Sequence, residues 1–212
     1  MKDFCAKYNV SHETYLKMEK YCQSLLDWQS RMNLVSNSSL EDIWNRHFED
    51  SAQLFNLVPL TAKNLLDIGS GAGFPGMVLA IIAEEKTPYL KVTLTESITK
   101  KTLFLNHVKN LVSLNNTNIL NERVEKIKNK KFSVITARAV TALTDLLEYS
   151  FPLLDKNGIC IFPKGKNYKK EIEQAQKQWD FSLTVVDSKT SEEGKILVIN
   201  KLTKKGRTKC QE

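Results

Sequence analysis

Apolar positions near the N-terminus recur at helical spacing. Across residues 11–32, apolar side chains follow one another three or four positions apart, with one polar interruption. That spacing marks one face of an amphipathic helix. Ser38 and Glu41 have the spacing of a capping box, which predicts a second helix over residues 38–56. We therefore expect residues 1–60 to form a helical N-terminal cap.

From residue 61 to residue 201, short apolar runs alternate with stretches of helical periodicity. The predicted strands cover residues 65–68, 90–95, 117–120, 132–136, 158–162, 182–187 and 195–200. The predicted helices cover residues 75–83, 99–112, 141–149 and 168–179. Strands alternating with helices predict an α/β fold with a seven-stranded, mostly parallel sheet. We expect the last two strands to form an antiparallel pair at its edge, followed by a basic tail over residues 202–212.

A glycine-rich segment joins the first predicted strand to the next helix. Residues 64–76 read NLLDIGSGAGFPG, and four of the chain's eight glycines lie within residues 69–76. Glycine permits tight turns and lets a ligand approach the backbone closely. Ligands of open parallel sheets bind at the carboxyl ends of the strands. The sequence therefore predicts a binding site at this turn.

Two kinds of nucleoside ligand compete for that site. Residues 71–76 match the GxGxxG fingerprint of dinucleotide-binding proteins. Residues 67–73, with the pattern DxGxGxG, instead match the nucleoside-binding loop of S-adenosylmethionine-dependent methyltransferases. Asp67, at the end of the strand, would repel a pyrophosphate and suits a ligand that carries an ammonium group. Glu96, at the end of the next strand, can accept hydrogen bonds from both ribose hydroxyls of either ligand.

The net charge of +7 is unevenly distributed along the chain. Residues 1–60 carry a net charge of −2, residues 61–150 carry +4 and residues 151–212 carry +5. Such an excess is compatible with binding a polyanion such as a nucleic acid. Because 26 of the 31 basic residues are lysines, a merely solvated surface remains an alternative.

Cysteine and hydropathy patterns exclude several classes of protein. The four cysteines are scattered without CxxC spacing, and there are only three histidines. We therefore expect reduced, packing cysteines and no metal site. No apolar run approaches the roughly 20 residues of a membrane span, and the N-terminus lacks the apolar segment of a secretory signal. These patterns predict a cytoplasmic protein that does not contact a membrane.

Two motifs carry a resemblance to a known family. The string GSGAGFPG at residues 69–76, with RHFEDS at residues 46–51, resembles the ribosomal RNA small subunit methyltransferase G family, also called glucose-inhibited division protein B. Further matching segments follow the same order at residues 33–34, 96–97, 100–101, 104–105, 123–125, 137–139 and 164–165. The resemblance covers about residues 25–200. It implies a class I methyltransferase fold and methyl transfer from S-adenosylmethionine to guanine N7 in a decoding-region loop of 16S rRNA.

The loop pattern and the resemblance together predict the cofactor contacts. The residues expected to bind S-adenosylmethionine are Gly69, Gly71, Phe74, Glu96, Val124, Glu125 and Arg138. Lysines near the same edge of the sheet, namely Lys100, Lys164 and Lys166, are candidates for contacts with RNA phosphates. Phe74 and Phe162 are candidates for stacking on an RNA base. We expect a monomer that acts on 16S rRNA, either free or in the small ribosomal subunit.

The implied reaction needs no proton transfer, because guanine N7 carries a free lone pair. Residues 136–139, after the fourth strand, read TARA, without the Asp/Asn-Pro-Pro-aromatic segment of amino-group methyltransferases or the cysteine of cytosine C5 methyltransferases. No acid–base residue is therefore assigned. Arg138 can orient a cofactor carboxylate, guanine O6 or a phosphate. Its alternative is a structural ion pair with Asp145 or Glu148.

The second helix carries a histidine that we interpret as structural. His47 is expected to be hydrogen-bonded rather than catalytic, with Asp50 orienting it or capping a nearby turn.

Two other functions of the protein remain open at this point. One is a nicotinamide-dependent oxidoreductase that uses the GxGxxG pattern, although no Tyr-x-x-x-Lys or paired His/Asp is present. The other is a non-catalytic RNA-binding module, which would have no need of the intact glycine loop and Glu96.

Overall fold

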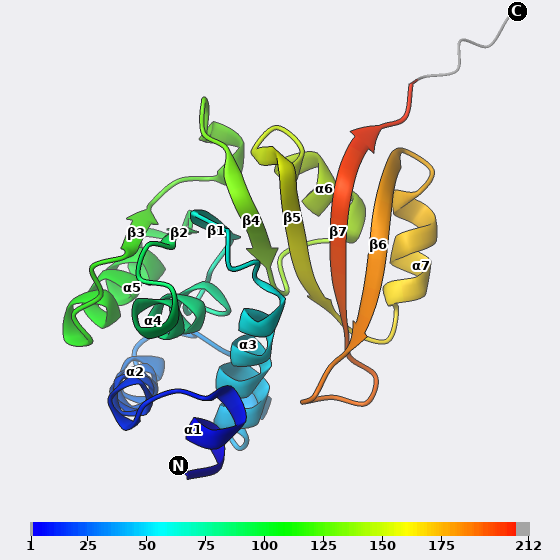
Figure 1. The fold of residues 1–212 in the computed structure, drawn as a ribbon. Helices are drawn as coiled ribbons and strands as arrows, with labels where there is room; N and C mark the ends of the chain where they lie inside the picture. Colours follow the sequence, from blue (N-terminus) through cyan, green and yellow to red (C-terminus); the bar gives the residue numbers. More distant parts are fainter. Residues whose placement is uncertain (1, 207–212) are drawn as a thin grey trace, which may run out of the picture.

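The computed structural model describes residues 2–206 and contains one seven-stranded sheet (Figure 1). The strands are β1 (Asn64–Ile68), β2 (Lys91–Thr95), β3 (Thr117–Leu120), β4 (Phe132–Ala137), β5 (Leu154–Lys164), β6 (Trp179–Asp187) and β7 (Lys195–Lys204). Their order is β3-β2-β1-β4-β5-β7-β6. Strands β1 to β5 pair in parallel, while β7 runs antiparallel to both β5 and β6. The predicted α/β fold and edge hairpin are confirmed.

Helices cover both faces of this sheet (Figure 1). The α-helices are α1 (Lys2–Tyr8), α2 (His12–Gln29), α3 (Asp50–Ala52), α4 (Gly76–Lys86), α5 (Thr99–Leu111), α6 (Leu143–Ser150) and α7 (Tyr168–Ala175). Alternate strand residues point to opposite faces. In β1, Leu65 therefore joins the core beneath α4 and α5, while Leu66 joins the core beneath α6 and α7.

The N-terminal helices form an additional layer rather than a separate unit. Every residue of α4 from Gly76 to Ala83 is buried, because α4 lies between the sheet and the helices α2 and α3 (Figure 1). A helix that is apolar on all sides is typical of such a position. One continuous core thus joins the predicted cap, residues 1–60, to one face of the sheet.

The predicted helix over residues 38–56 is wrong in its form. The chain instead makes a 3₁₀ turn η1 (Asn37–Ser39), a π-helix η2 (Trp44–Glu49), the short α3 and a 3₁₀ segment η3 (Gln53–Leu57). The capping box fails because the Ser38 hydroxyl pairs with the Ser36 hydroxyl, 3.3 Å away, rather than with the backbone near Glu41. Helix formation therefore starts later than the pattern predicts.

Two other boundaries differ from the sequence-based ones. Helix α7 ends at Ala175 rather than at residue 179, because Trp179 opens β6 and is buried in the core. Strand β7 continues to Lys204, so the predicted boundary between residues 201 and 202 falls inside a strand. Residues 207–212 of the predicted tail lie outside the described residues.

Within residues 2–206, no helix combines the length and apolar character needed to cross a bilayer.

Candidate functional site: a cleft at the carboxyl edge of the sheet

The glycine loop follows β1, the strand at which the strand order reverses. Strands β2 and β3 lie on one side of β1, and β4 and the later strands lie on the other. Gly69, Gly71 and Gly73 all have positive φ, at +62°, +58° and +104°, a conformation that side chains with a Cβ rarely adopt. A Cβ at Gly69 would also lie 2.9 Å from a methyl group of Val140, which would have to move. A Cβ at Gly71 would meet no protein atom closer than 3.9 Å and would project into open space.

Asp67 does not face a ligand, which corrects the prediction made for its carboxylate. Its side chain is fully buried, and its Oδ2 accepts a hydrogen bond from the Gly76 backbone N–H at 3.1 Å. Its Oδ1 accepts from the Thr136 hydroxyl at 2.9 Å, because Asp67 and Thr136 are direct partners in the β1–β4 ladder. Burial raises the pKa of Asp67 to about 6. Asp67 therefore anchors the N-terminus of α4 to the sheet.

A cleft follows the loop and joins two cavities of about 440 Å³ and 250 Å³. The larger cavity is lined by Gly71, Phe74 and Arg138, among others, and the smaller one by Val124 and Glu125. Gly69 and Glu96 line both cavities. All seven residues predicted to bind the cofactor thus line these two cavities, which adjoin at Gly69 and Glu96 and together form the cleft.

Glu96 connects the loop to the end of β2. Its Oε2 accepts a hydrogen bond from the Gly71 backbone N–H at 3.0 Å, and its Oε1 accepts from the Ile98 backbone N–H at 2.7 Å. A carboxylate has about four lone-pair positions, so two remain for ligand hydroxyls. Because the side chain is held by backbone groups on both sides, it presents these positions to the cleft in a fixed orientation.

Arg138, which follows β4, contacts η2 and the first residue of α3 rather than α6. Its Nη1 donates to the carbonyl oxygen of Arg46 at 2.7 Å and to Asp50 Oδ2 at 3.0 Å. The predicted alternative, an ion pair with Asp145 or Glu148, is wrong: Asp145 accepts from Thr141 and Glu148 pairs with Lys204. The Asp50 carboxylate binds Arg138 and, in the described chain, makes no hydrogen bond to the His47 ring. Its backbone N–H donates to the carbonyl oxygens of Asn45 and His47 at the end of η2, which agrees with the predicted capping role.

His47 is the third group that contacts the Arg138 guanidinium. Its Nδ1 lies 2.6 Å from Arg138 Nη2, and its Nε2 lies 2.8 Å from the Ser39 hydroxyl. Arginine can only donate, so Nδ1 accepts and Nε2 carries the proton. Burial, followed by the charges of Arg138 and Arg46, lowers the pKa of His47 to about 4. The imidazole is therefore neutral at pH 7, and its structural interpretation agrees with this geometry.

The Phe74 ring packs against neighbouring side chains of the site and offers no free ring face. Its ring stacks on His47 at 4.8 Å and on Tyr21 at 5.3 Å between centroids, and the Arg138 guanidinium lies 5.2 Å from its centroid. Phe162 is completely buried. Stacking of an RNA base on Phe162 is thus excluded by its burial, and Phe74 is already covered by His47 and Tyr21.

Two components of this site were not identified from the sequence. Thr190, in the loop between β6 and β7, donates its hydroxyl to Asp50 Oδ1 at 2.8 Å. Ser39 holds the imidazole of His47, as described above. Neither residue has a local sequence signal. The RHFEDS string around His47 and Asp50 was the available clue that this segment serves a site.

The three predicted RNA-contacting lysines lie in different environments. Lys100 and Lys166 are exposed. The Lys164 ammonium instead donates to the Thr141 carbonyl at 3.0 Å and to Glu171 at 2.7 Å, and only 9% of its side chain is exposed. A phosphate contact at Lys164 is not supported, because its ammonium already has internal partners.

Among the described residues, no group of three or more His, Cys, Asp and Glu side chains is placed to hold a metal ion. Cys5, Cys22 and Cys160 are free thiols, while Cys210 lies outside residues 2–206. The buried Cys160 has its pKa raised to about 12 by desolvation, which suits a packing thiol.

Comparison with known proteins agrees with this geometry. The family model described as rRNA small subunit methyltransferase G matches residues 14–199. The Ribosomal RNA small subunit methyltransferase G of Paramagnetospirillum magneticum is 36% identical over 203 residues, which are 96% of each chain. That of Cereibacter sphaeroides is 41% identical over 189 residues, covering 89% of this chain and 90% of the relative.

Solved structures with the same fold are more distant in sequence. The ribosomal protein L11 methylase from Lactobacillus delbrueckii subsp. bulgaricus has a TM-score of 0.58 and 15% identity, covering 76% of this chain and 79% of that one. TYW2 from M. jannaschii, in complex with AdoMet, has a TM-score of 0.55 and 16% identity, covering 75% and 76%. These likenesses show the fold, and the sequence matches show the family. This chain belongs to the rRNA small subunit methyltransferase G family.

Proposed function

We propose that this protein transfers the methyl group of S-adenosylmethionine to guanine N7 in the decoding-region loop of 16S rRNA. The observation that carries this proposal is the cleft lined by Gly71, Glu96 and Arg138, in a chain that belongs to this family. The cleft offers an open backbone at Gly71, a carboxylate at Glu96 and a guanidinium at Arg138. These groups match a ligand that has a nucleoside part and an amino-acid part.

The residues of the cleft fit this cofactor. A Cβ at Gly71 would occupy the space that the ligand needs, and the two remaining acceptor positions of Glu96 suit the two ribose hydroxyls. Val124 and Glu125 line the smaller cavity, which we assign to the adenine ring. Arg138 uses three of its five N–H donors within the described chain. The other two are available for the carboxylate of the methionine part.

The protein's own contribution to the reaction is positioning. When bound, S-adenosylmethionine supplies an electrophilic methyl group on a sulfonium. Guanine N7 attacks with its lone pair and loses no proton, so a general base is not required. The geometry of His47 is consistent with the absence of a general base, because its only unprotonated nitrogen already accepts a hydrogen bond from Arg138. Holding the reacting atoms in line and close together can supply most of the acceleration in such a transfer.

The substrate is a polyanion, and the charge of the chain suits it. Exposed Lys100 and Lys166 lie at the carboxyl ends of β2 and β5, the edge of the sheet where the cleft opens, and we assign them contacts with RNA phosphates. We place the protein in the cytoplasm as a monomer that acts on rRNA or on the small ribosomal subunit.

The dinucleotide alternative is disfavoured by the first turn of α4. In dinucleotide-binding proteins, the pyrophosphate lies at the helix N-terminus. Here the Asp67 carboxylate occupies that position and accepts the Gly76 N–H. A pyrophosphate would meet a like charge and would lack this donor.

The test uses the protein, methyl-labelled S-adenosylmethionine and small ribosomal subunits from cells that lack the activity. After incubation, the RNA is digested and the labelled nucleoside is identified. Label in 7-methylguanosine is the expected result. Label in a different nucleoside would overturn the assignment of N7. Absence of both label and S-adenosylmethionine binding would overturn the methyltransferase function.

A further inference from the structure

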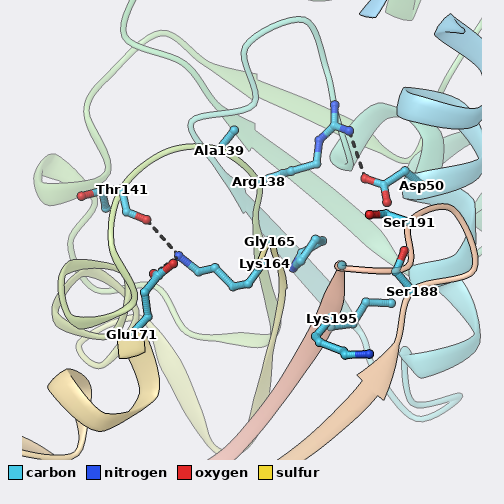
Figure 2. A pocket seen from close by; sticks show the side chains of 13 residues that line it. Asp50, Arg138, Ala139, Thr141, Lys164, Gly165, Glu171, Ser188, Ser191 and Lys195 are labelled. Carbon is cyan, nitrogen blue, oxygen red and sulfur yellow. Dashed lines mark hydrogen bonds and ion pairs between the residues drawn. The ribbon is translucent and has the colours of Figure 1, made fainter. Parts of the chain in front are cut away.

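A further cavity, of about 400 Å³, adjoins the cofactor cleft on the other side of Arg138 (Figure 2). Arg138 and Ala139 line both this cavity and the larger part of the cleft, so the two spaces share a wall. Its volume lies within the range of roughly 300–1,000 Å³ that is typical of small-molecule sites. It lies beyond the carboxyl end of β5 and is closed on one side by the loop between β6 and β7.

Two ion pairs stand on opposite sides of this cavity (Figure 2). Arg138 pairs with Asp50 on the side toward the cofactor cleft, and Lys164 pairs with Glu171 on the far side. These are the two carboxylates that line the cavity. The two pairs differ in what they leave available to a ligand.

Asp50 has both carboxylate oxygens engaged. Its Oδ2 accepts from Arg138, and its Oδ1 accepts from the Thr190 hydroxyl and the Gln53 amide. The Asp50 carboxylate therefore serves contacts within the protein and is not available to a ligand.

Glu171 is held by only one of its oxygens. Its Oε2 accepts from the Lys164 ammonium at 2.7 Å and from the Leu143 backbone N–H at 2.8 Å. Its Oε1 has no hydrogen-bond partner among residues 2–206, and 26% of the side chain is exposed. The anchored Oε2 fixes the direction of the carboxylate, so Oε1 is a preorganised acceptor at the cavity wall.

We propose that this cavity receives the target guanine and that Glu171 Oε1 recognises its Watson–Crick edge. The inference rests on the proposed function. In guanine, N7 lies at one end of the base, and the N1–H and the 2-amino group lie at the other. With N7 turned toward the shared wall at Arg138 and Ala139, the donor end points to the far side, where Glu171 stands. A carboxylate oxygen has two lone pairs, so Oε1 can accept from both N–H donors.

This arrangement also selects against adenine. Adenine presents an unprotonated N1, an acceptor, where guanine presents N1–H. An acceptor facing the Glu171 carboxylate would leave both groups without a hydrogen and bring like partial charges together. Glu171 would thus be a specificity-determining residue, and Lys164 a positioning residue that holds it.

The test compares guanine with inosine at the target position of 16S rRNA in reconstituted small subunits. Inosine keeps N7, O6 and N1–H and lacks only the 2-amino group. The variants are Glu171→Gln and, as the matched control, Glu173→Gln, which changes an exposed glutamate of the same helix. The measured quantity is kcat/KM for methyl transfer to each substrate. Thermal unfolding and S-adenosylmethionine affinity report whether each variant is folded.

The unmodified protein and Glu173→Gln are expected to prefer guanine over inosine on the order of 10- to 100-fold. Glu171→Gln is expected to lose a similar factor on guanine and to show a preference close to one. Lys164→Gln removes one of the two groups that hold Glu171 but keeps the carboxylate and its bond from the Leu143 backbone N–H. It is therefore expected to lower kcat/KM while a preference for guanine remains.

Two results would overturn the assignment of Glu171. One is an unchanged preference for guanine in folded Glu171→Gln, and the other is no preference in the unmodified protein. If Glu171→Gln does not fold, Glu171→Asp decides, because it keeps the carboxylate but withdraws it from the cavity by one methylene. An unchanged preference for guanine in folded Glu171→Asp would overturn the assignment. Failure of the unmodified protein to methylate the guanine substrate would instead overturn the proposed function.

Discussion

Asp50 and Arg138 lie 88 residues apart in the chain and pair at 3.0 Å between Oδ2 and Nη1. Their side chains are only 18% and 17% exposed, so solvent screens the pair less than it would a surface ion pair. Thr190 and Gln53 hold Asp50 in turn. The Arg138 guanidinium, which borders the cleft, is therefore oriented by residues that precede the first strand of the sheet.

Replacing Asp50 with asparagine tests this orientation. We expect Asp50→Asn to raise the Kd for S-adenosylmethionine about tenfold, because an amide replaces a charge-assisted acceptor for Arg138. Titration calorimetry measures the affinity. Glu41→Gln, at an exposed residue of the preceding turn, is the control and should leave the Kd unchanged. An unchanged Kd in folded Asp50→Asn would show that the pair serves stability alone.

Arg138 itself should not tolerate lysine. The guanidinium serves the Arg46 carbonyl, Asp50 and His47 at once, and an ammonium lacks the planar fork that makes this possible. We expect Arg138→Lys to lower kcat/KM roughly 100-fold. Steady-state kinetics with labelled cofactor measures the effect. Activity within a few-fold of the unmodified protein would contradict the role assigned to the fork.

Gly71 should be sensitive to the smallest side chain. Alanine there must adopt a φ of +58°, at a cost of about 1–2 kcal/mol, and its methyl group enters the cleft. We expect Gly71→Ala to lower S-adenosylmethionine affinity more than tenfold while the protein stays folded. Gly206→Ala is the control, since a Cβ there meets nothing within 4 Å. A loss of stability without a loss of affinity would argue against ligand contact at Gly71.

The lowered pKa of His47, about 4 against an ordinary value of 6.5, predicts a dependence of stability on pH. The unfolded chain binds a proton at this residue below pH 6.5, whereas the folded protein does so only near pH 4. Stability contributed by His47 is therefore lost as the pH falls from 6.5 to 4, by about 3 kcal/mol at most.

The measurement compares chemical unfolding of the unmodified protein and His47→Gln across this pH range. The difference in unfolding free energy between the two should shrink or reverse as the pH falls. Asp67, whose pKa of about 6 makes stability change in the opposite direction, is present in both proteins and cancels. A difference that is constant with pH would contradict a neutral, buried His47.

Local patterns predicted much of the fold and one half of the site. The glycine loop, Glu96 and the parallel strands follow from composition and period over a few residues, and all lie where the sequence placed them. Asp67 was misinterpreted because its partner, Thr136, comes from a neighbouring strand in the β1–β4 ladder. Strand pairing between distant segments has no local signature, so a carboxylate at a strand end looked available to a ligand.

The other half of the site depends on tertiary contacts. Nothing near Arg138 indicates Asp50 as its partner, and the sequence offered only Asp145 or Glu148 as the alternative to a ligand contact. Lys164 looked like a free charge after a strand, yet Glu171, on the first turn of α7, neutralises it. The capping box at Ser38 failed for a related reason, since its hydroxyl found a closer partner within a 3₁₀ turn.

The bond between Thr190 and Asp50 has a consequence for the order in which the enzyme matures. Asp50 emerges early during synthesis, and the glycine loop soon after it, but Thr190 belongs to the connection between the last two strands. Because the ribosome releases the chain from its N-terminus onward, Arg138 gains its fully supported partner only once nearly the whole polypeptide has been made. A nascent chain that ends before residue 188 would carry every residue that lines the cleft. It would still lack the Thr190 hydroxyl that holds Asp50, and through Asp50 the Arg138 guanidinium, in place.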